Sequence, residues 1–255
     1  MKTIATLLLL TSLFFSSCYI STSHEPAQPL KEANRHVATF ERIELLGSPS
    51  IYYTQGDSIS IRVEAPQDII EYVETEVEDG KLTVCLKNNI MNQVKNLQFM
   101  DGEDIKVFVT SPDLIEIKLL GSGDFYCQGH LDTDNLNIEL RGSGDIEFDD
   151  IICDQVGTQL MGSGDIEVKH VRTGFSSVEL VGSGDVKMAV EGAQSTNINL
   201  RGSGDVKMTL KNCGNVQSTV HGSGDVTLKG NVNTLQSSTI GSGEHHTEEL
   251  LVARH

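Results

Sequence analysis

Acidic residues recur in this sequence at intervals of 19 to 21 residues, each directly after a Gly-Ser-Gly tripeptide. If the repeats stack as strands, neighbouring carboxylates lie about 4.8 Å apart. Rows of carboxylates can bind calcium, but an Asp in a turn also accepts hydrogen bonds from the backbone amides of that turn. We favour the structural turn role, with calcium as the alternative. The residues concerned are Asp124, Asp145, Asp165, Asp185, Asp205, Asp225 and Glu244.

Thiols are the second group that could carry chemistry. Excluding Cys18, the chain contains Cys85, Cys127, Cys153 and Cys213. Cys127 takes the slot that Phe148 fills one repeat later, so we expect a small buried hydrophobic residue. Cys153 and Cys213 lie three repeats apart, about 14 Å at strand spacing, which is too far for a disulfide. The sequence therefore predicts reduced thiols without a redox or metal role.

Other catalytic or metal-binding patterns are weak. His245 and His246 are neighbours, and adjacent side chains on an extended chain point to opposite sides. We therefore expect a solvated tail there instead of a metal site. No Ser-His-Asp arrangement, paired-carboxylate cleft, P-loop or HExxH motif can be placed. We predict no catalytic residues, no bound metal and no cofactor other than the calcium alternative.

The elements that position these residues follow from the repeat itself. Gly-Ser-Gly-Asp begins at Gly121, Gly142, Gly162, Gly182, Gly202 and Gly222, and Gly-Ser-Gly-Glu begins at Gly241. The residues after each corner alternate, as in Ile146, Glu147 and Phe148, and an apolar residue such as Leu140 lies two positions before it. Period-2 alternation indicates short strands, and a fixed 20-residue period indicates stacked coils. The sequence predicts an all-β fold, a right-handed parallel β-helix over residues 116–255.

Residues 37–115 are β-rich but do not follow the 20-residue register. Phe40–Leu45 and Ser58–Val63 alternate, and Asp79-Gly80 is a good hairpin turn. One helical turn is plausible at Ile69–Tyr72. A repeat stack needs an irregular end unit to cover its open core. This segment is expected to be the N-terminal cap or to contribute the first coils.

The first residues have the pattern of a secretory signal. Lys2 precedes an apolar run too short to span a membrane, which predicts a signal peptide over residues 1–17. The segment Leu13–Ser17 resembles a lipobox, so Cys18 is the expected lipidation site and the lipid is the expected link to the membrane. An ordinary secretory peptide is the alternative. Residues 18–36 are polar and are predicted to form the lipid anchor and a flexible tether.

The strongly negative net charge of the chain excludes some classes of binding partner. The formal charge is −17, and removing residues 1–17 makes it −18 because one lysine is lost. Such an acidic chain is unsuited to binding nucleic acid or an anionic membrane surface. We expect no nucleic-acid partner.

Several motifs together resemble one protein family. They are Gln55-Gly56-Asp57, the hairpin Val77–Val84, the segment Ser111–Leu114 and the serial Gly-Ser-Gly-Asp corners. This combination is similar to the DUF2807 family, also called the auto-transporter adhesin head GIN domain, over nearly the whole mature chain. The resemblance implies the solenoid fold and an adhesin-like role. It carries over no catalytic or binding residue, and no auto-transporter barrel is present in the sequence.

We interpret the chain as a non-enzymatic lipoprotein of the cell envelope, on the periplasmic or surface side of the outer membrane. Its solenoid is expected to present flat faces to a carbohydrate or a protein. The alternative is a polysaccharide lyase or hydrolase, because such enzymes also use parallel β-helices. Those enzymes build clefts from long unequal loops, whereas these coils vary only between 19 and 21 residues in length.

Overall fold

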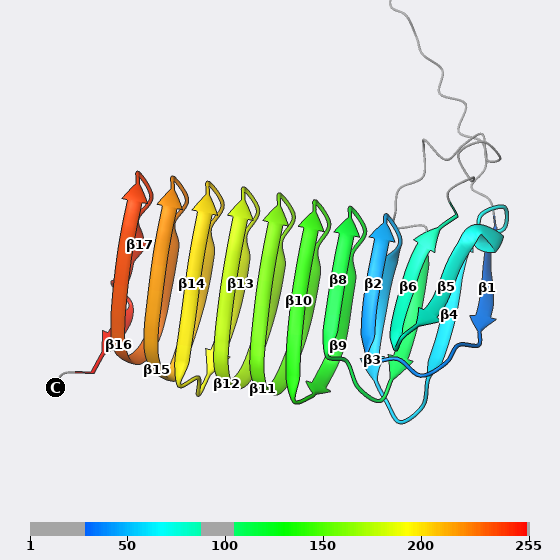
Figure 1. The fold of residues 1–255 in the computed structure, drawn as a ribbon, viewed down its shortest axis with the longest axis horizontal. Helices are drawn as coiled ribbons and strands as arrows, with labels where there is room; N and C mark the ends of the chain where they lie inside the picture. The colour runs from blue at the N-terminus through cyan, green and yellow to red at the C-terminus, as the bar shows by residue number, and fades with distance from the viewer. Residues whose placement is uncertain (1–28, 88–104, 254–255) are drawn as a thin grey trace, which may run out of the picture.

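The computed structural model describes residues 29–87 and 105–253. It is a β-solenoid of about seven turns with coils of about 20 residues. The coils lie in a row, with the Gly-Ser-Gly corners along one edge and the N-terminal part of the chain at one end (Figure 1). The fold class predicted from the repeat is confirmed.

Each coil contributes to two parallel sheets, which meet at the corner. We call the strands that lead into the corner the pre-corner sheet. In stacking order it consists of β6 (Lys81–Leu86), β2 (Arg42–Gly47), β8 (Glu116–Gly121), β10 (Asn135–Gly142), the second halves of β11 (Ile146–Gly162) and β12 (Ile166–Gly182), β14 (Ser195–Gly202), and the second halves of β15 (Val206–Gly222) and β16 (Val226–Gly241).

The strands that leave the corner form the post-corner sheet. In stacking order it consists of β7 (Lys106–Ser111), β3 (Ser50–Gln55), β9 (Phe125–Asp132), the first halves of β11 and β12, β13 (Val186–Glu191), the first halves of β15 and β16, and then β17 (His245–His246) and β18 (Leu250–Val252).

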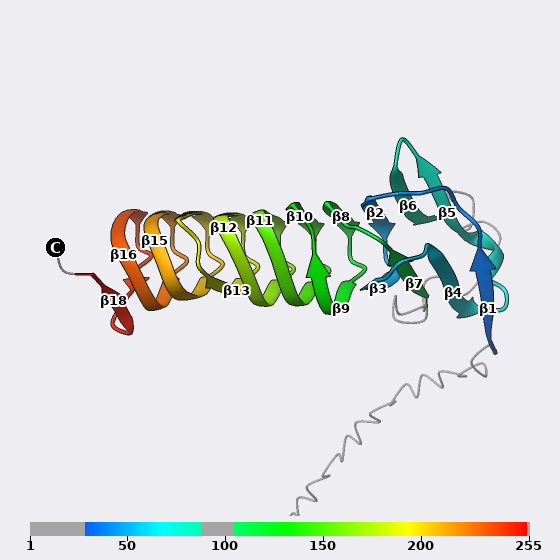
Figure 2. The ribbon, with the colours of Figure 1, turned by 90° about the horizontal axis from the view of Figure 1, so that it is seen from below.

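The N-terminal end of the stack is closed by antiparallel strands. β4 (Ser60–Pro66) pairs with β7, and β1 (Leu30–Arg35) pairs with β4. β5 (Val73–Glu78) forms a hairpin with β6, and the 3-10 turn η1 (Ile70–Tyr72) precedes it. These elements gather at one end of the solenoid (Figure 2). The irregular terminal unit thus shares its sheets with the coils.

The structure corrects one boundary at the N-terminus. A flexible tether was expected through residue 36, but Leu30–Arg35 form β1, which the antiparallel ladder with β4 holds in place. The predicted signal peptide, residues 1–17, and Cys18 lie outside the described residues. Within 29–87 and 105–253, no helix is long and apolar enough to cross a membrane.

The structure contains one further coil that the repeat motif in the sequence does not mark. Gly47 pairs with Gly121 at the end of the β2–β8 ladder, so Gly47-Ser48-Pro49 is the corner of the coil formed by β2 and β3. Ser122 and Gly123 donate their amides to the carbonyl of Gly47, at 3.0 and 2.8 Å. Pro49 lacks an amide hydrogen and stands where later corners have glycine. This substitution broke the sequence signature.

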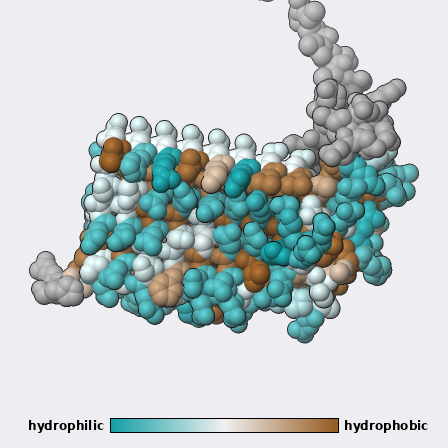
Figure 3. Space-filling model, viewed as in Figure 1, coloured by the Kyte–Doolittle hydropathy of each residue, from teal (hydrophilic) through white to brown (hydrophobic). Residues whose placement is uncertain are grey.

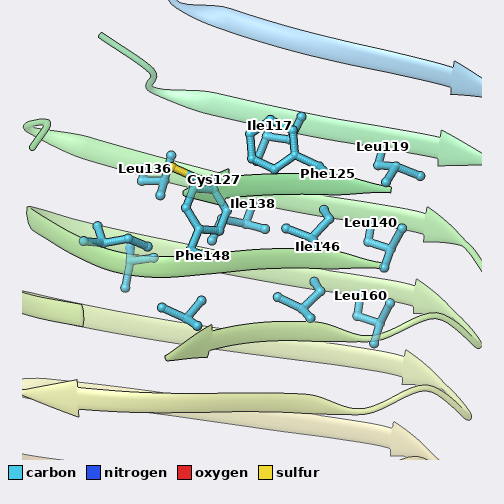
Figure 4. Close-up of a cluster of buried hydrophobic side chains, with 14 of the residues drawn as sticks. Ile117, Leu119, Phe125, Cys127, Leu136, Ile138, Leu140, Ile146, Phe148 and Leu160 are labelled. Carbon is cyan, nitrogen blue, oxygen red and sulfur yellow. The ribbon is translucent and has the colours of Figure 1, made fainter. Parts of the chain in front are cut away.

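Inward side chains form columns that run from coil to coil. Leu119, Leu140 and Leu160 lie above one another and are fully buried, and the rings of Phe125 and Phe148 have centroids 5.5 Å apart (Figure 4). Burying one such side chain contributes about 1.5–3 kcal/mol. Because each column continues into the next coil, a strand buries its apolar face only by stacking on its neighbours.

Glycine is required at the corners because the backbones approach too closely for any side chain. Gly162 has φ +148°, and a Cβ there would lie 2.0 Å from the carbonyl oxygen of Gly142. A Cβ on Gly164 would lie 1.9 Å from the carbonyl oxygen of Gly144. The fixed spacing of the stack therefore selects glycine at both positions of each corner from Gly121 to Gly243.

We predict that Gly164→Ala destabilises the fold by about 1–3 kcal/mol or more. The new methyl group would push the backbone of its coil away from the backbone of the preceding coil. Gly157→Ala is the matched control, since its Cβ would meet no backbone and only two side-chain oxygens, at 3.3 and 3.6 Å. Glycine weakens a strand interior, so the control should be neutral or stabilising. Urea unfolding measures both changes, and equal midpoints for the two variants would contradict the steric account.

Candidate functional site

The repeated acids form a single column along the corner edge. Each Asp accepts, through Oδ1, the backbone amide of the acid one coil further on. Asp165 accepts from the amide of Asp185 at 2.8 Å, and Asp225 accepts from that of Glu244 at 2.8 Å. The other contacts in the column measure 3.0 to 3.1 Å. The carboxylates thus serve as acceptors between coils.

This geometry corrects the expectation that each Asp binds amides of its own turn. Three consecutive amides at each corner need acceptors. At the corner of Gly162, the amides of Ser163 and Gly164 both donate to the carbonyl of Gly142, at 2.9 and 3.2 Å. The third amide, that of Asp165, donates to Oδ1 of Asp145 at 3.1 Å. Stacking explains the difference, because the next coil offers an amide at strand spacing.

Neighbouring carboxylates in the column repel one another, and this repulsion affects the pKa of Asp145. Burial raises the pKa of Asp145, the amide of Asp165 opposes that shift, and the charges of Asp124 and Asp165 raise the pKa further. Lys207 offsets part of the charge, with its Nζ 3.3 Å from Asp205 and 3.6 Å from Asp185. The column is therefore a structural ladder, and the second oxygens of Asp185 and Asp205 face Lys207.

The structure places the four cysteines where their thiols have low reactivity. Cys127 is buried in the post-corner strand, and burial raises its pKa to about 12. Burial likewise raises the pKa of Cys153 and Cys213. Cys85 is half-buried, and burial together with the nearby Glu74 carboxylate raises its pKa. All four thiols are free in the structure, and a thiol with a raised pKa has little reactive thiolate.

The two histidines near the C-terminus are part of the fold. They form β17 instead of the expected solvated tail, because the strand pairs with β16. His245 contacts Ser218 at 2.9 Å and Thr239 at 3.0 Å, whereas His246 lies 3.5 Å from Asp225. The two rings point to opposite sides, as extended backbone requires. In 29–87 and 105–253, no three His, Cys, Asp or Glu side chains are grouped to hold a metal ion.

A row of aromatic rings lies on the outer side of the post-corner sheet. Tyr52 stacks on Phe108 and on Tyr126, with centroids 5.3 and 5.1 Å apart. The Arg62 guanidinium lies 4.0 Å from the Phe108 centroid. Because the rings stack face to face along the solenoid, their faces are occupied by one another. This row stabilises the stack and offers mainly ring edges to a ligand.

A second polar column joins four coils on the post-corner side. Asp150 lies 2.6 Å from Nδ1 of both His130 and His170, and Glu191 lies 3.3 Å from Nε2 of His170. The hydrogen bond that His170 donates to the Asp150 carboxylate raises the pKa of His170 and lowers the pKa of Asp150. Asp150 and the two histidines are partly exposed, so each pair between them contributes about 0.2–1 kcal/mol.

The outer side of the pre-corner sheet is mostly polar. In Figure 3 the pale band of Gly-Ser corners runs along one edge, and apolar residues appear only as scattered patches below it. Sequence reasoning did not single out the one exposed aromatic residue described here, Phe175, which is 48% exposed. Its signal was present, because the same position in the neighbouring repeats is occupied by Gln155 and Ser195.

Comparison with protein families settles the relationship. The family model DUF2807, described as "Putative auto-transporter adhesin, head GIN domain", matches residues 39–208 and 171–254. The chain belongs to this family. The resemblance found in the sequence is confirmed, and the match includes both the irregular end unit and the coils. No curated protein matches the sequence.

Solved structures share the whole architecture. An adhesin-titled structure from Bacteroides fragilis is 25% identical, with a TM-score of 0.71, covering 87% of this chain and 98% of that one. An adhesin-titled structure from Parabacteroides distasonis is 20% identical (TM-score 0.70; 86% and 97% covered). A structure titled as a lipid binding protein, from the same species, is 19% identical (TM-score 0.67; 85% and 96% covered). The last two show the fold alone.

Together, the family and the neighbour from Bacteroides fragilis identify an adhesin-like scaffold. Such a scaffold is associated with the cell envelope or the extracellular space. The repeated polar columns bond from coil to coil and hold this stack together.

We predict that Asp165→Asn is neutral or slightly stabilising, because the amide oxygen still accepts from Asp185 and one charge leaves the column. Asp165→Ala loses the acceptor and should cost about 0.5–1.5 kcal/mol. Thermal unfolding with and without EDTA measures both. A melting temperature that falls in EDTA and returns with calcium, with Asn as damaging as Ala, would show that the column is a calcium site.

Proposed function

We propose that this protein is a non-enzymatic scaffold of the cell envelope whose flat solenoid faces bind a carbohydrate or a protein. The observation that carries the proposal is the uniformity of the coils. From Gly121 to Gly241 every corner pairs with the next in register. No long loop rises between strands there to enclose a substrate, so a partner must bind to a flat face.

The interior supports the same proposal. The columns of Leu, Ile, Val and Phe fill the space between the two sheets, with most side chains at 0–2% exposure. One fold-related structure is described as a lipid binding protein, but here apolar side chains occupy the space between the two sheets. The outer faces of the two sheets are therefore the surfaces to which a partner can bind.

The proposed location is the outer membrane, on its periplasmic or surface side, with Cys18 as the acylated residue. Two or more acyl chains suffice for stable anchoring. The acidic body, with a formal charge of −17 for the whole chain, would be repelled by anionic lipid, so the lipid must supply the attachment. The polar residues after Cys18 would hold the body away from the bilayer.

The function is tested with the full chain in detergent on an array of glycans and in pull-downs from envelope protein fractions. We expect binding to a glycan or to a protein partner without turnover. Each bound glycan is then incubated with the protein and assayed for new reducing ends and for the unsaturated product of β-elimination. Turnover would overturn the proposal in favour of a polysaccharide lyase or hydrolase.

For the anchor, we predict that wild type partitions into the detergent phase of a phase-separation assay and that Cys18→Ala stays in the aqueous phase. Thiol-to-methyl replacement at one residue does not change hydrophobicity enough to have this effect unless acyl chains are lost. Ser17→Ala is the matched control and should partition as wild type does. Equal partitioning of wild type and Cys18→Ala would contradict the proposal that Cys18 carries a lipid anchor.

A further inference from the structure

A hollow of about 630 Å³ lies on the outer side of the pre-corner sheet. It crosses five successive strands, from the residue before β8, through β10, β11 and β12, to β14. Four strand spacings of about 4.8 Å make it roughly 19 Å long. Its outward-facing lining residues are Asn135, Asn137, Gln155, Gly157, Phe175, Ser177, Ser195 and Asn197.

Gly157 creates the hollow. In the ladder it stands between Asn137 and Ser177, and it leaves a gap in a row of outward side chains. A Cβ there would meet only Oδ1 of Asn137 at 3.3 Å and Oγ of Ser177 at 3.6 Å. Unlike the corner glycines, Gly157 is therefore not required by backbone packing, and a larger residue would fit in the strand and fill the space.

Phe175 lies beside this gap and is not part of the core. Its ladder neighbours are Gln155 on one side and Ser195 on the other. Nearly half of its surface is exposed, at 48%. In the described part of the chain it takes no part in the ring stacks formed by Tyr52 and its neighbours. An exposed aromatic ring with short neighbours is available to an external ligand.

The polar groups around the ring are also unused. Within 29–87 and 105–253, the side-chain amides of Asn135, Asn137, Gln155 and Asn197 make no hydrogen bond. Further along the same sheet such groups bond to each other, as between Thr234 and Asn215 at 2.8 Å. Each free amide offers both donors and acceptors to a ligand.

Charge defines the ligand class. No lining residue of the hollow is charged, although the chain carries 36 acids and 19 basic residues. An anionic ligand would find no cation there and would be repelled by the acidic surroundings. A neutral ligand rich in hydroxyl groups, with one apolar face for the ring, fits the available groups.

We propose that this hollow is a binding site for a neutral oligosaccharide. The C–H face of one sugar ring packs on Phe175, and the hydroxyls of that sugar and its neighbours bond to the amides and to Ser177. The strand spacing of about 4.8 Å is close to the length of one hexose unit in an extended glycan. A chain running along the solenoid axis therefore meets equivalent polar groups in successive coils. This inference rests on the proposed function and names its ligand.

The test uses the full chain in detergent and arrays of gluco-, galacto- and manno-oligosaccharides, with sialylated and sulfated glycans as the anionic arm. Wild type should bind a neutral oligosaccharide. Phe175→Ala and Gly157→Thr should each weaken that binding at least tenfold. Threonine favours strands, so Gly157→Thr should keep or raise the melting temperature while it fills the hollow. Ile240→Ala, which trims an exposed residue of the same sheet outside the hollow, should bind as wild type does.

The outcomes separate this site from the broader function. Neutral glycan binding that neither Phe175→Ala nor Gly157→Thr weakens would overturn the site and leave the scaffold function standing. Binding to anionic glycans alone, or to a protein alone, would overturn the ligand class in the same way. Turnover of a bound glycan would overturn the proposed function itself.

Discussion

The structure depends on the contact between glycine backbones at successive corners. A Cβ at these positions would lie about 2 Å from a carbonyl oxygen of the previous corner, which no side chain tolerates. Once glycine allows this approach, two corner amides reach the carbonyl below them and the strands on both sides fall into register. Every coil must then have nearly the same length, and the two sheets become flat. The absence of long loops between Gly121 and Gly241 is thus a consequence of how the corners pack.

The same contact explains how a column of acids is tolerated. Two charges at strand spacing repel by about 1 kcal/mol in water and by several times that amount at an effective dielectric constant of 20. The corner leaves one amide per coil without a backbone acceptor, and the carboxylate of the preceding coil accepts it. A charged hydrogen bond of this kind contributes about 1.5–3 kcal/mol, which is comparable with the repulsion and opposes it. The acids therefore belong to the packing of the corner.

Much of the fold could be predicted because Gly121, Asp145 and their equivalents recur in the sequence with the period of the coils. The coil at Gly47 was missed because Pro49 replaces the second glycine, although Leu45 and Ile51 keep the apolar positions of the repeat. The direction of the Asp hydrogen bonds depends on the register between coils, which a single repeat does not contain. Phe175 was overlooked for the opposite reason, since one apolar residue among strands looks like core until its side of the sheet is known. Strand β1 has a tether-like composition, and only its pairing with β4 orders it.

The order of the coils in space differs from their order in the sequence at one end. β2 lies between β6 and β8, so Gly47 meets its partner Gly121 only after 74 further residues have been synthesised. Closing that long loop costs entropy before the contact is made, and non-local pairing of this kind slows folding. Every later coil joins an edge formed only about 20 residues earlier. The N-terminal end is therefore expected to set the folding rate, and the remaining coils to add rapidly by propagation from a finished template.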